Sequence, residues 1–112
     1  MTIEYKDFEN VGIRVGKIIE VTDFKEARNP SYKLKIDFGK KIGVKKSAAQ
    51  IVANYTKAQL KGKLIICVTE FAPKQIANFM SEVLVLGIED NKGNITLLSP
   101  DSKDIELGSR IY

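Results

Sequence analysis

The sequence predicts a small domain made mainly of β-strands, in which five short strands close into an antiparallel barrel of the Greek-key type. Three observations support this prediction. The chain has 112 residues, which suits one domain. Its apolar residues gather in short segments that alternate with polar residues or are rich in β-branched side chains. The long helices that connect the strands of a parallel sheet are absent. We therefore expect residues 1–112 to form a single β-barrel domain with two short helices.

The first part of the chain predicts one helix and two strands. Residues 5–11 are typical of a short N-terminal helix. Residues 13–21 predict the first strand, bent near Gly16, where glycine permits a bulge that would turn Lys17 outward. Residues 32–38 alternate strictly between apolar and polar residues, so the second strand has one apolar face and one largely basic outer face.

The second part of the chain predicts further strands and a helix between the third and fourth strands. The third strand is expected at residues 43–51, and the short helix at residues 55–60. Residues 63–70 and 82–88 contain continuous apolar runs rich in β-branched residues, as expected for central strands that are covered on both faces. After a turn, residues 95–98 predict a last strand.

Basic residues are concentrated in the middle of the chain. Residues 24–63 carry eleven lysines and arginines against two acidic residues, a local charge of +9, whereas the whole chain carries +4. This separation indicates a basic face that attracts polyanions, although a lysine-rich surface without spatial clustering is the alternative. Five-stranded Greek-key barrels bind oligonucleotides on their second and third strands. In this chain those strands carry Lys33, Lys35, Lys45 and Lys46.

The residue types that the chain lacks exclude most catalytic chemistry. It contains no histidine, so a Ser-His-Asp triad or a histidine-based zinc site is not available. Its one cysteine, Cys67, lies in an apolar run, where we expect a buried core residue and not a reactive thiol. The acidic clusters Glu89-Asp90 and Asp101 with Asp104 lie in predicted turns and offer too few convergent oxygens for a metal ion. We expect no enzyme activity, no cofactor and no metal.

Localisation is predicted from the apolar segments and from the N-terminus. No apolar run approaches the roughly 20 residues that cross a bilayer. The first ten residues are polar and acidic, unlike a secretory signal. These features predict a cytoplasmic protein without membrane insertion.

One connection is longer than a hairpin requires. Residues 70–82 carry one basic residue, Lys74, and four large apolar residues: Phe71, Ile76, Phe79 and Met80. In a predicted loop these apolar side chains either plug the end of the barrel or receive a ligand. In the second case an aromatic ring next to Lys74 offers a stacking surface beside a phosphate anchor, and Met80 offers an adaptable contact.

Five segments that follow one another along the chain carry a family resemblance: IRVGKI (13–18), EARNPSYKLKIDFG (26–39), AQI (49–51), PKQI (73–76) and SEVLVLG (81–87). Together they resemble the stand-alone tRNA-binding domain family, and within it most of all the CsaA-type secretion chaperones. The resemblance implies an OB-fold barrel that forms a homodimer and has no catalytic activity.

The resemblance also implies where ligands bind. Lys74 and Ser81 match motif positions that line the nucleic-acid site in the tRNA-binding relatives, and other polar residues fall on the neighbouring strand face. With the lysines of the second and third strands, the predicted RNA-binding set is Arg28, Lys33, Lys35, Lys45, Lys46, Gln50, Lys74 and Ser81. The apolar loop matches the peptide cleft of the chaperone-like branch, and the predicted peptide-binding set is Phe71, Ile76, Phe79 and Met80.

Two functions stay open at this point. One is a non-catalytic homodimer that binds tRNA or tRNA-like RNA on a basic strand face and acts in protein export. The other is a peptide-binding secretion chaperone that holds unfolded preproteins for the Sec pathway, with the Sec translocase as a partner and little or no RNA role. Salt separates the two functions, because phosphate contacts weaken as salt rises whereas apolar burial does not.

Overall fold

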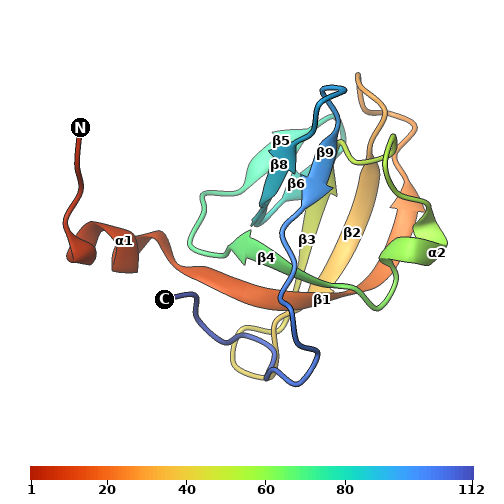
Figure 1. Cartoon of the computed structure of the whole chain (residues 1–112). Helices are drawn as coiled ribbons and strands as arrows, with labels where there is room; N and C mark the ends of the chain where they lie inside the picture. The colour runs from red at the N-terminus through yellow and green to blue at the C-terminus, as the bar shows by residue number, and fades with distance from the viewer.

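Five strands form the main sheet of the molecule, in the order β3-β2-β1-β4-β7, and two hairpins, β5–β6 and β8–β9, complete it (Figure 1). The computed structural model describes all residues, 1–112. Its elements are α1 (Tyr5–Val11), β1 (Ile13–Asp23), β2 (Tyr32–Asp37), β3 (Val44–Ala49), α2 (Lys57–Leu60), β4 (Leu64–Val68), β5 (Lys74–Ile76), β6 (Phe79–Ser81), β7 (Leu84–Val85), β8 (Gly87–Glu89) and β9 (Ile95–Leu97). The five-stranded, antiparallel and nearly closed barrel of the OB type is confirmed.

Strand β1 is shared between the two halves of the barrel. Its first residues pair with β4, and its later residues pair with β2. The predicted bulge at Gly16 is wrong, because the register shift lies between Ile18 and Glu20. Gly16 serves close packing, since a Cβ atom there would lie 2.6 Å from Cγ2 of Ile36. Lys17 is exposed, as predicted.

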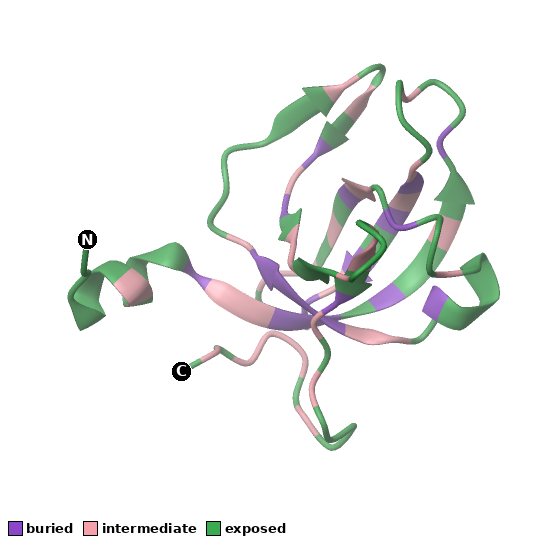
Figure 2. Cartoon of the chain, turned by 45° about the horizontal axis from the view of Figure 1, so that its top comes forward, coloured by how far each residue is buried: buried purple, intermediate pink, exposed green.

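The core lies inside the barrel, where the buried residues gather on the central strands (Figure 2). Alternation along β2 places Leu34 and Ile36 in the core, and both are almost fully buried. Cys67 of β4 is buried among them, and this burial raises the pKa of its thiol to about 12. The thiol is therefore an inert part of the core at neutral pH.

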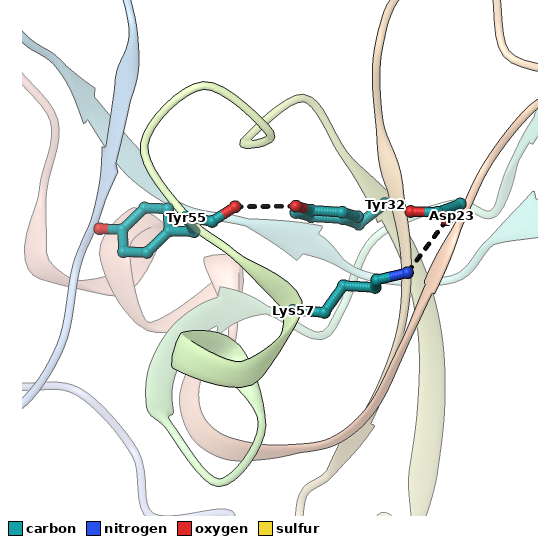
Figure 3. A network of polar contacts seen from close by, with 4 residues as sticks. All are labelled: Asp23, Tyr32, Tyr55 and Lys57. Carbon is teal, nitrogen blue, oxygen red and sulfur yellow. Dashed lines mark hydrogen bonds and ion pairs between the residues drawn. The ribbon is translucent and has the colours of Figure 1, made fainter.

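The connection around α2 is fixed by polar contacts (Figure 3). The hydroxyl of Tyr32 donates a hydrogen bond of 2.8 Å to the carbonyl of Tyr55, and Nζ of Lys57 lies 3.0 Å from Oδ2 of Asp23. Thr56 caps the helix by accepting a hydrogen bond from the Gln59 N–H at 3.2 Å. These contacts hold α2 against β1 and the start of β2.

Two predicted segments differ from the structure. Residues 82–88 do not form one central strand. Only the two residues of β7 pair with β4, and the β8–β9 hairpin begins at Gly87. Residues 70–82 are not an irregular loop, because β5 and β6 pair within them. The hairpin turns at Ala77, whose φ of 52° is in the left-handed region. Both differences shape the site described below.

Neither helix has the length and hydropathy that crossing a membrane requires. The chain also contains no group of three or more cysteine, aspartate or glutamate side chains placed to hold a metal ion.

Candidate functional site

A groove of about 480 Å³ lies between the β5–β6 hairpin, the end of β3 and the segment from β7 to β9. It brings together five residues that the sequence assigned to two different ligands: Gln50, Phe71, Lys74, Ile76 and Ser81. Eleven of its sixteen lining residues are hydrophobic, so the walls are mainly apolar. A groove of this composition suits an apolar segment of a ligand, with Lys74 available for a negative group.

The β5–β6 hairpin is fastened to the free edge of β3 by buried hydroxyl groups. Oγ of Ser81 accepts a hydrogen bond of 3.1 Å from the Ala48 N–H and lies 3.2 Å from Oγ of Ser47. Ser47 Oγ in turn lies 2.9 Å from the carbonyl oxygen of Val83, to which it donates. The backbone of Lys46 also bonds to Glu82. Ser81 therefore closes the barrel as well as lining the groove.

The lysines of β2 and β3 lie on both faces of the strands. Lys35 is paired directly with Lys46, and Lys33 lies on the same outer face. Lys45 is paired with the buried Ile36 and lies on the other face, so it does not join the other three lysines. Lys35 is partly neutralised, because its Nζ lies 3.0 Å from Oε2 of Glu20. Lys33 and Lys46 have no such carboxylate partner.

An aromatic-lysine cluster forms where the hairpin meets this outer face, and its members are Phe24, Lys33, Lys46 and Phe79. The two rings are in edge-to-face contact, with centroids 5.5 Å apart. Nζ of Lys33 lies 4.9 Å from the ring centre of Phe24 and 5.5 Å from that of Phe79, and Nζ of Lys46 lies 5.4 Å from the latter. The half-buried ring of Phe79 is thus flanked by two ammonium groups.

The predicted peptide-binding set is divided between different surfaces. Phe71 and Ile76 line the groove, whereas Phe79 belongs to the aromatic-lysine cluster. Met80 is paired with Gln75, so it lies on the opposite face of the hairpin from the pair formed by Ile76 and Phe79. Met80 is exposed there and does not line the groove.

Two residues complete the comparison with the sequence predictions. Arg28 is exposed in the connection between β1 and β2, where its side chain has no hydrogen-bond or ion-pair partner. The sequence analysis missed Phe24, which is buried under the hairpin. A single aromatic residue within an otherwise polar connection was the available signal, because burying such a ring requires a partner from elsewhere in the chain.

Comparison with known proteins identifies the family. Residues 13–110 match the family model described as "Putative tRNA binding domain". The chain belongs to the tRNA-binding domain family. Among its relatives, the methionine–tRNA ligase of Pyrococcus horikoshii is 34% identical over 109 residues. This alignment covers 97% of the tRNA-binding domain described here but only 14% of the ligase.

Two solved structures of similar proteins match this tRNA-binding domain over 99% or more of its length. The CsaA chaperone protein of Picrophilus torridus is 55% identical, with a TM-score of 0.91, and the match covers 99% of this chain and 100% of that one. The chaperone CsaA of Bacillus anthracis str. Ames is 39% identical, also with a TM-score of 0.91, and the match covers 100% of both chains. The resemblance to the CsaA-type branch is therefore confirmed.

Proposed function

We propose that this tRNA-binding domain is a non-catalytic protein that holds tRNA or tRNA-like RNA on the outer face of β2 and β3. The observation that carries the proposal is the aromatic-lysine cluster. The ring of Phe79 offers a surface on which a base stacks, and Lys33 and Lys46 place two ammonium groups beside that ring, where phosphates of the same RNA strand pass. Membership of the tRNA-binding domain family supports the same ligand.

The proposal predicts how binding depends on salt. Each phosphate that a lysine neutralises releases counterions, and log K falls by about 0.7 to 0.9 per unit of log salt for each contact. Lys33 and Lys46 have no carboxylate partner. RNA phosphates therefore contact both ammonium groups without breaking an ion pair within the protein. Lys35 contributes less, because RNA competes there with Glu20.

Charge reversal at the cluster tests the proposal. Lys33→Glu combined with Lys46→Glu is compared with a control of equal charge change, Lys92→Glu combined with Lys103→Glu, in which both lysines are exposed and lie outside the cluster. tRNA affinity is measured by fluorescence anisotropy between about 50 and 200 mM salt. We expect the cluster variant to bind far more weakly and with a salt slope reduced by about 1.5. Equal behaviour of the two variants, or a flat salt dependence of the unchanged protein, would refute RNA binding at this face.

A second function is favoured by the apolar groove. We propose that the groove accepts apolar segments of unfolded or exported polypeptides, as the likeness to CsaA chaperone proteins suggests, and that the protein acts in cytoplasmic protein export with the Sec translocase as a partner. Because apolar burial drives this contact, added salt leaves it unchanged or strengthens it. A peptide panel titrated at the same salt concentrations tests this function. Ile76→Ser is expected to weaken binding, whereas Met80→Ser, on the other face of the hairpin, is the control.

We also infer that the protein assembles as a homodimer. Helix α1 buries none of its residues, and apolar side chains near both ends of the chain are open to solvent, including Tyr5 at 62% and Tyr112 at 91% exposure. Uncovered apolar side chains of this kind are commonly buried by a two-fold interface. Sedimentation at micromolar concentration is expected to give a dimer, and Tyr5→Ser to weaken it. A monomer would contradict the inference.

A further inference from the structure

A second concave surface lies at the opposite end of the β2–β3 hairpin from the groove. It encloses about 800 Å³ between the turn that joins β2 to β3 and the C-terminal segment at residues 106–109. Figure 1 shows these two segments side by side below the barrel. We call this surface the turn pocket. The strand pairing places it beyond the Asp37–Val44 pair, whereas Gln50 of the groove follows the Tyr32–Ala49 pair at the other end.

The walls of the turn pocket are fixed by close backbone packing. Gly39 and Gly108 both have left-handed backbones, with φ of 87° and 89°. A Cβ atom on Gly108 would lie 2.3 Å from the carbonyl oxygen of Phe38, and one on Gly39 would lie 2.6 Å from that of Leu107. Only glycine allows the two segments to approach this closely. A hydrogen bond of 2.8 Å from the Gly108 N–H to the Val15 carbonyl holds the C-terminal segment in place.

Positive charge predominates in the turn pocket. Nη1 of Arg14 donates a hydrogen bond of 2.7 Å to the Gly108 carbonyl, which fixes the half-buried guanidinium and leaves its other N–H groups without a partner in the chain. Lys40 and Lys41 are exposed and take part in neither ion pair of the molecule. Glu106 is the one acidic residue among those that line the pocket. Three cations thus face one carboxylate.

The backbone of the turn adds uncharged donors. The N–H groups of Lys40, Lys41 and Ile42 have no acceptor in the chain, whereas the flanking Gly39 and Gly43 donate to Asp37 Oδ1 and to the Gly39 carbonyl. Successive free N–H groups in a turn form concavities that bind anions. Together with a guanidinium and two ammonium groups, they supply the donors that phosphate oxygens accept.

We propose that the turn pocket binds a phosphate group of the RNA chain, as an anchor separate from the aromatic-lysine cluster. The assignment of that phosphate to RNA rests on the proposed function, whereas the existence of a phosphate site does not. The six paired positions of β2 and β3 span about 20 Å, a distance that a few nucleotides cover along the basic outer face. The two sites therefore hold one RNA segment at two points.

The first arm of the test uses tripolyphosphate and does not depend on RNA. Amide chemical shifts of the full chain are followed by NMR as tripolyphosphate is added. We expect saturable changes confined to residues 39–43 and 107–109, about tenfold weaker binding for Lys40→Ala with Lys41→Ala, and tighter binding for Glu106→Gln. Lys92→Ala with Lys103→Ala is the matched control. A misfolded pocket does not bind its ligand more tightly, so the Glu106 variant separates loss of fold from loss of charge.

Chemical-shift changes spread over all lysines without saturation, or equal binding by Lys40→Ala with Lys41→Ala and by the control, would overturn the phosphate site.

The second arm measures tRNA affinity of the same variants. We expect the Lys40 and Lys41 variant to lose about 0.7 to 0.9 units of salt slope, the share of one phosphate contact, in addition to the loss caused by Lys33→Glu with Lys46→Glu. Tripolyphosphate binding with unchanged tRNA affinity would overturn RNA as the source and assign the pocket to a free phosphate compound. Absence of tRNA binding by the unchanged protein would refute the proposed function, and the tripolyphosphate arm would then decide the site alone.

Discussion

Replacing Ser81 by alanine removes the hydroxyl that joins β6 to the edge of β3. Ser81 is only 8% exposed, and its Oγ accepts the hydrogen bond from the Ala48 N–H at 3.1 Å. In Ser81→Ala this N–H has no acceptor, whereas Ser47 keeps its bond of 2.9 Å to the Val83 carbonyl. The change therefore removes one half of the two-serine contact and leaves the other half in place.

The magnitude follows from the burial of the donor that is left behind. An orphaned buried N–H costs about 1 to 3 kcal/mol. Ala48 is partly exposed, so water replaces some of the lost bond, and we expect the free energy of unfolding to fall by about 1 to 1.5 kcal/mol. That is a substantial share of the roughly 5 to 15 kcal/mol that stabilises a small domain.

Urea unfolding followed by circular dichroism measures this loss, and hydrogen exchange locates it. Exchange is expected to rise most at the Ala48 amide, and the hairpin that carries Lys74 and Ile76 is expected to loosen with it. Ser102→Ala is the control, since that hydroxyl accepts only the Asp104 N–H in an exposed turn. The reasoning fails if both variants unfold at the same urea concentration and the Ala48 amide exchanges at its original rate.

Three further changes test the core and the site. Gly16→Ala would place a Cβ atom 2.6 Å from Cγ2 of Ile36 and 2.7 Å from Cε1 of Phe38, both fully buried, so we expect a loss of about 1 to 3 kcal/mol and a lower Tm in thermal unfolding. Burial raises the pKa of Cys67 from 9.0 to about 12, so the unfolded chain loses the thiol proton first as pH rises. The free energy of unfolding should then fall above about pH 9, by up to about 1.4 kcal/mol per unit, and Cys67→Ala should remove this part of the slope in urea titrations. Phe79→Leu keeps an apolar contact but removes the stacking surface, and we expect about tenfold weaker tRNA binding in anisotropy titrations with peptide binding retained.

The parts of the fold that follow local rules were predicted well. Residues 32–38 alternate strictly, and β2 has the expected faces, because a half-buried strand alternates its side chains between core and solvent. The predicted helix at residues 5–11 coincides with α1, and α2 lies within the predicted residues 55–60. Cys67 is buried, as its apolar neighbours indicated.

The parts that depend on register and unusual turns were not predicted. The β5–β6 hairpin turns through Ala77 in a left-handed conformation, without the glycine that usually marks such a turn. The position of Lys45 on the inner face follows from its pairing with Ile36, which charge along the sequence does not report. The contact of Phe24 with Phe79 joins segments more than fifty residues apart, and no local pattern in either segment signals the other.

Helix α1 has a further consequence for how the protein responds to dilution. It is seven residues long, and an isolated helix of that length does not persist in water. The side chain of Asp7, which accepts from the Glu4 N–H at 3.0 Å, secures only its first turn, and none of its residues enters the core. A hydrogen bond of 3.1 Å from Arg110 Nη2 to the Glu9 carbonyl ties it to the C-terminal segment and not to the core. We therefore expect that separating the two copies of the inferred dimer unwinds residues 5–11 and leaves the sheet intact. The helix content of the N-terminus then reports whether the dimer is assembled.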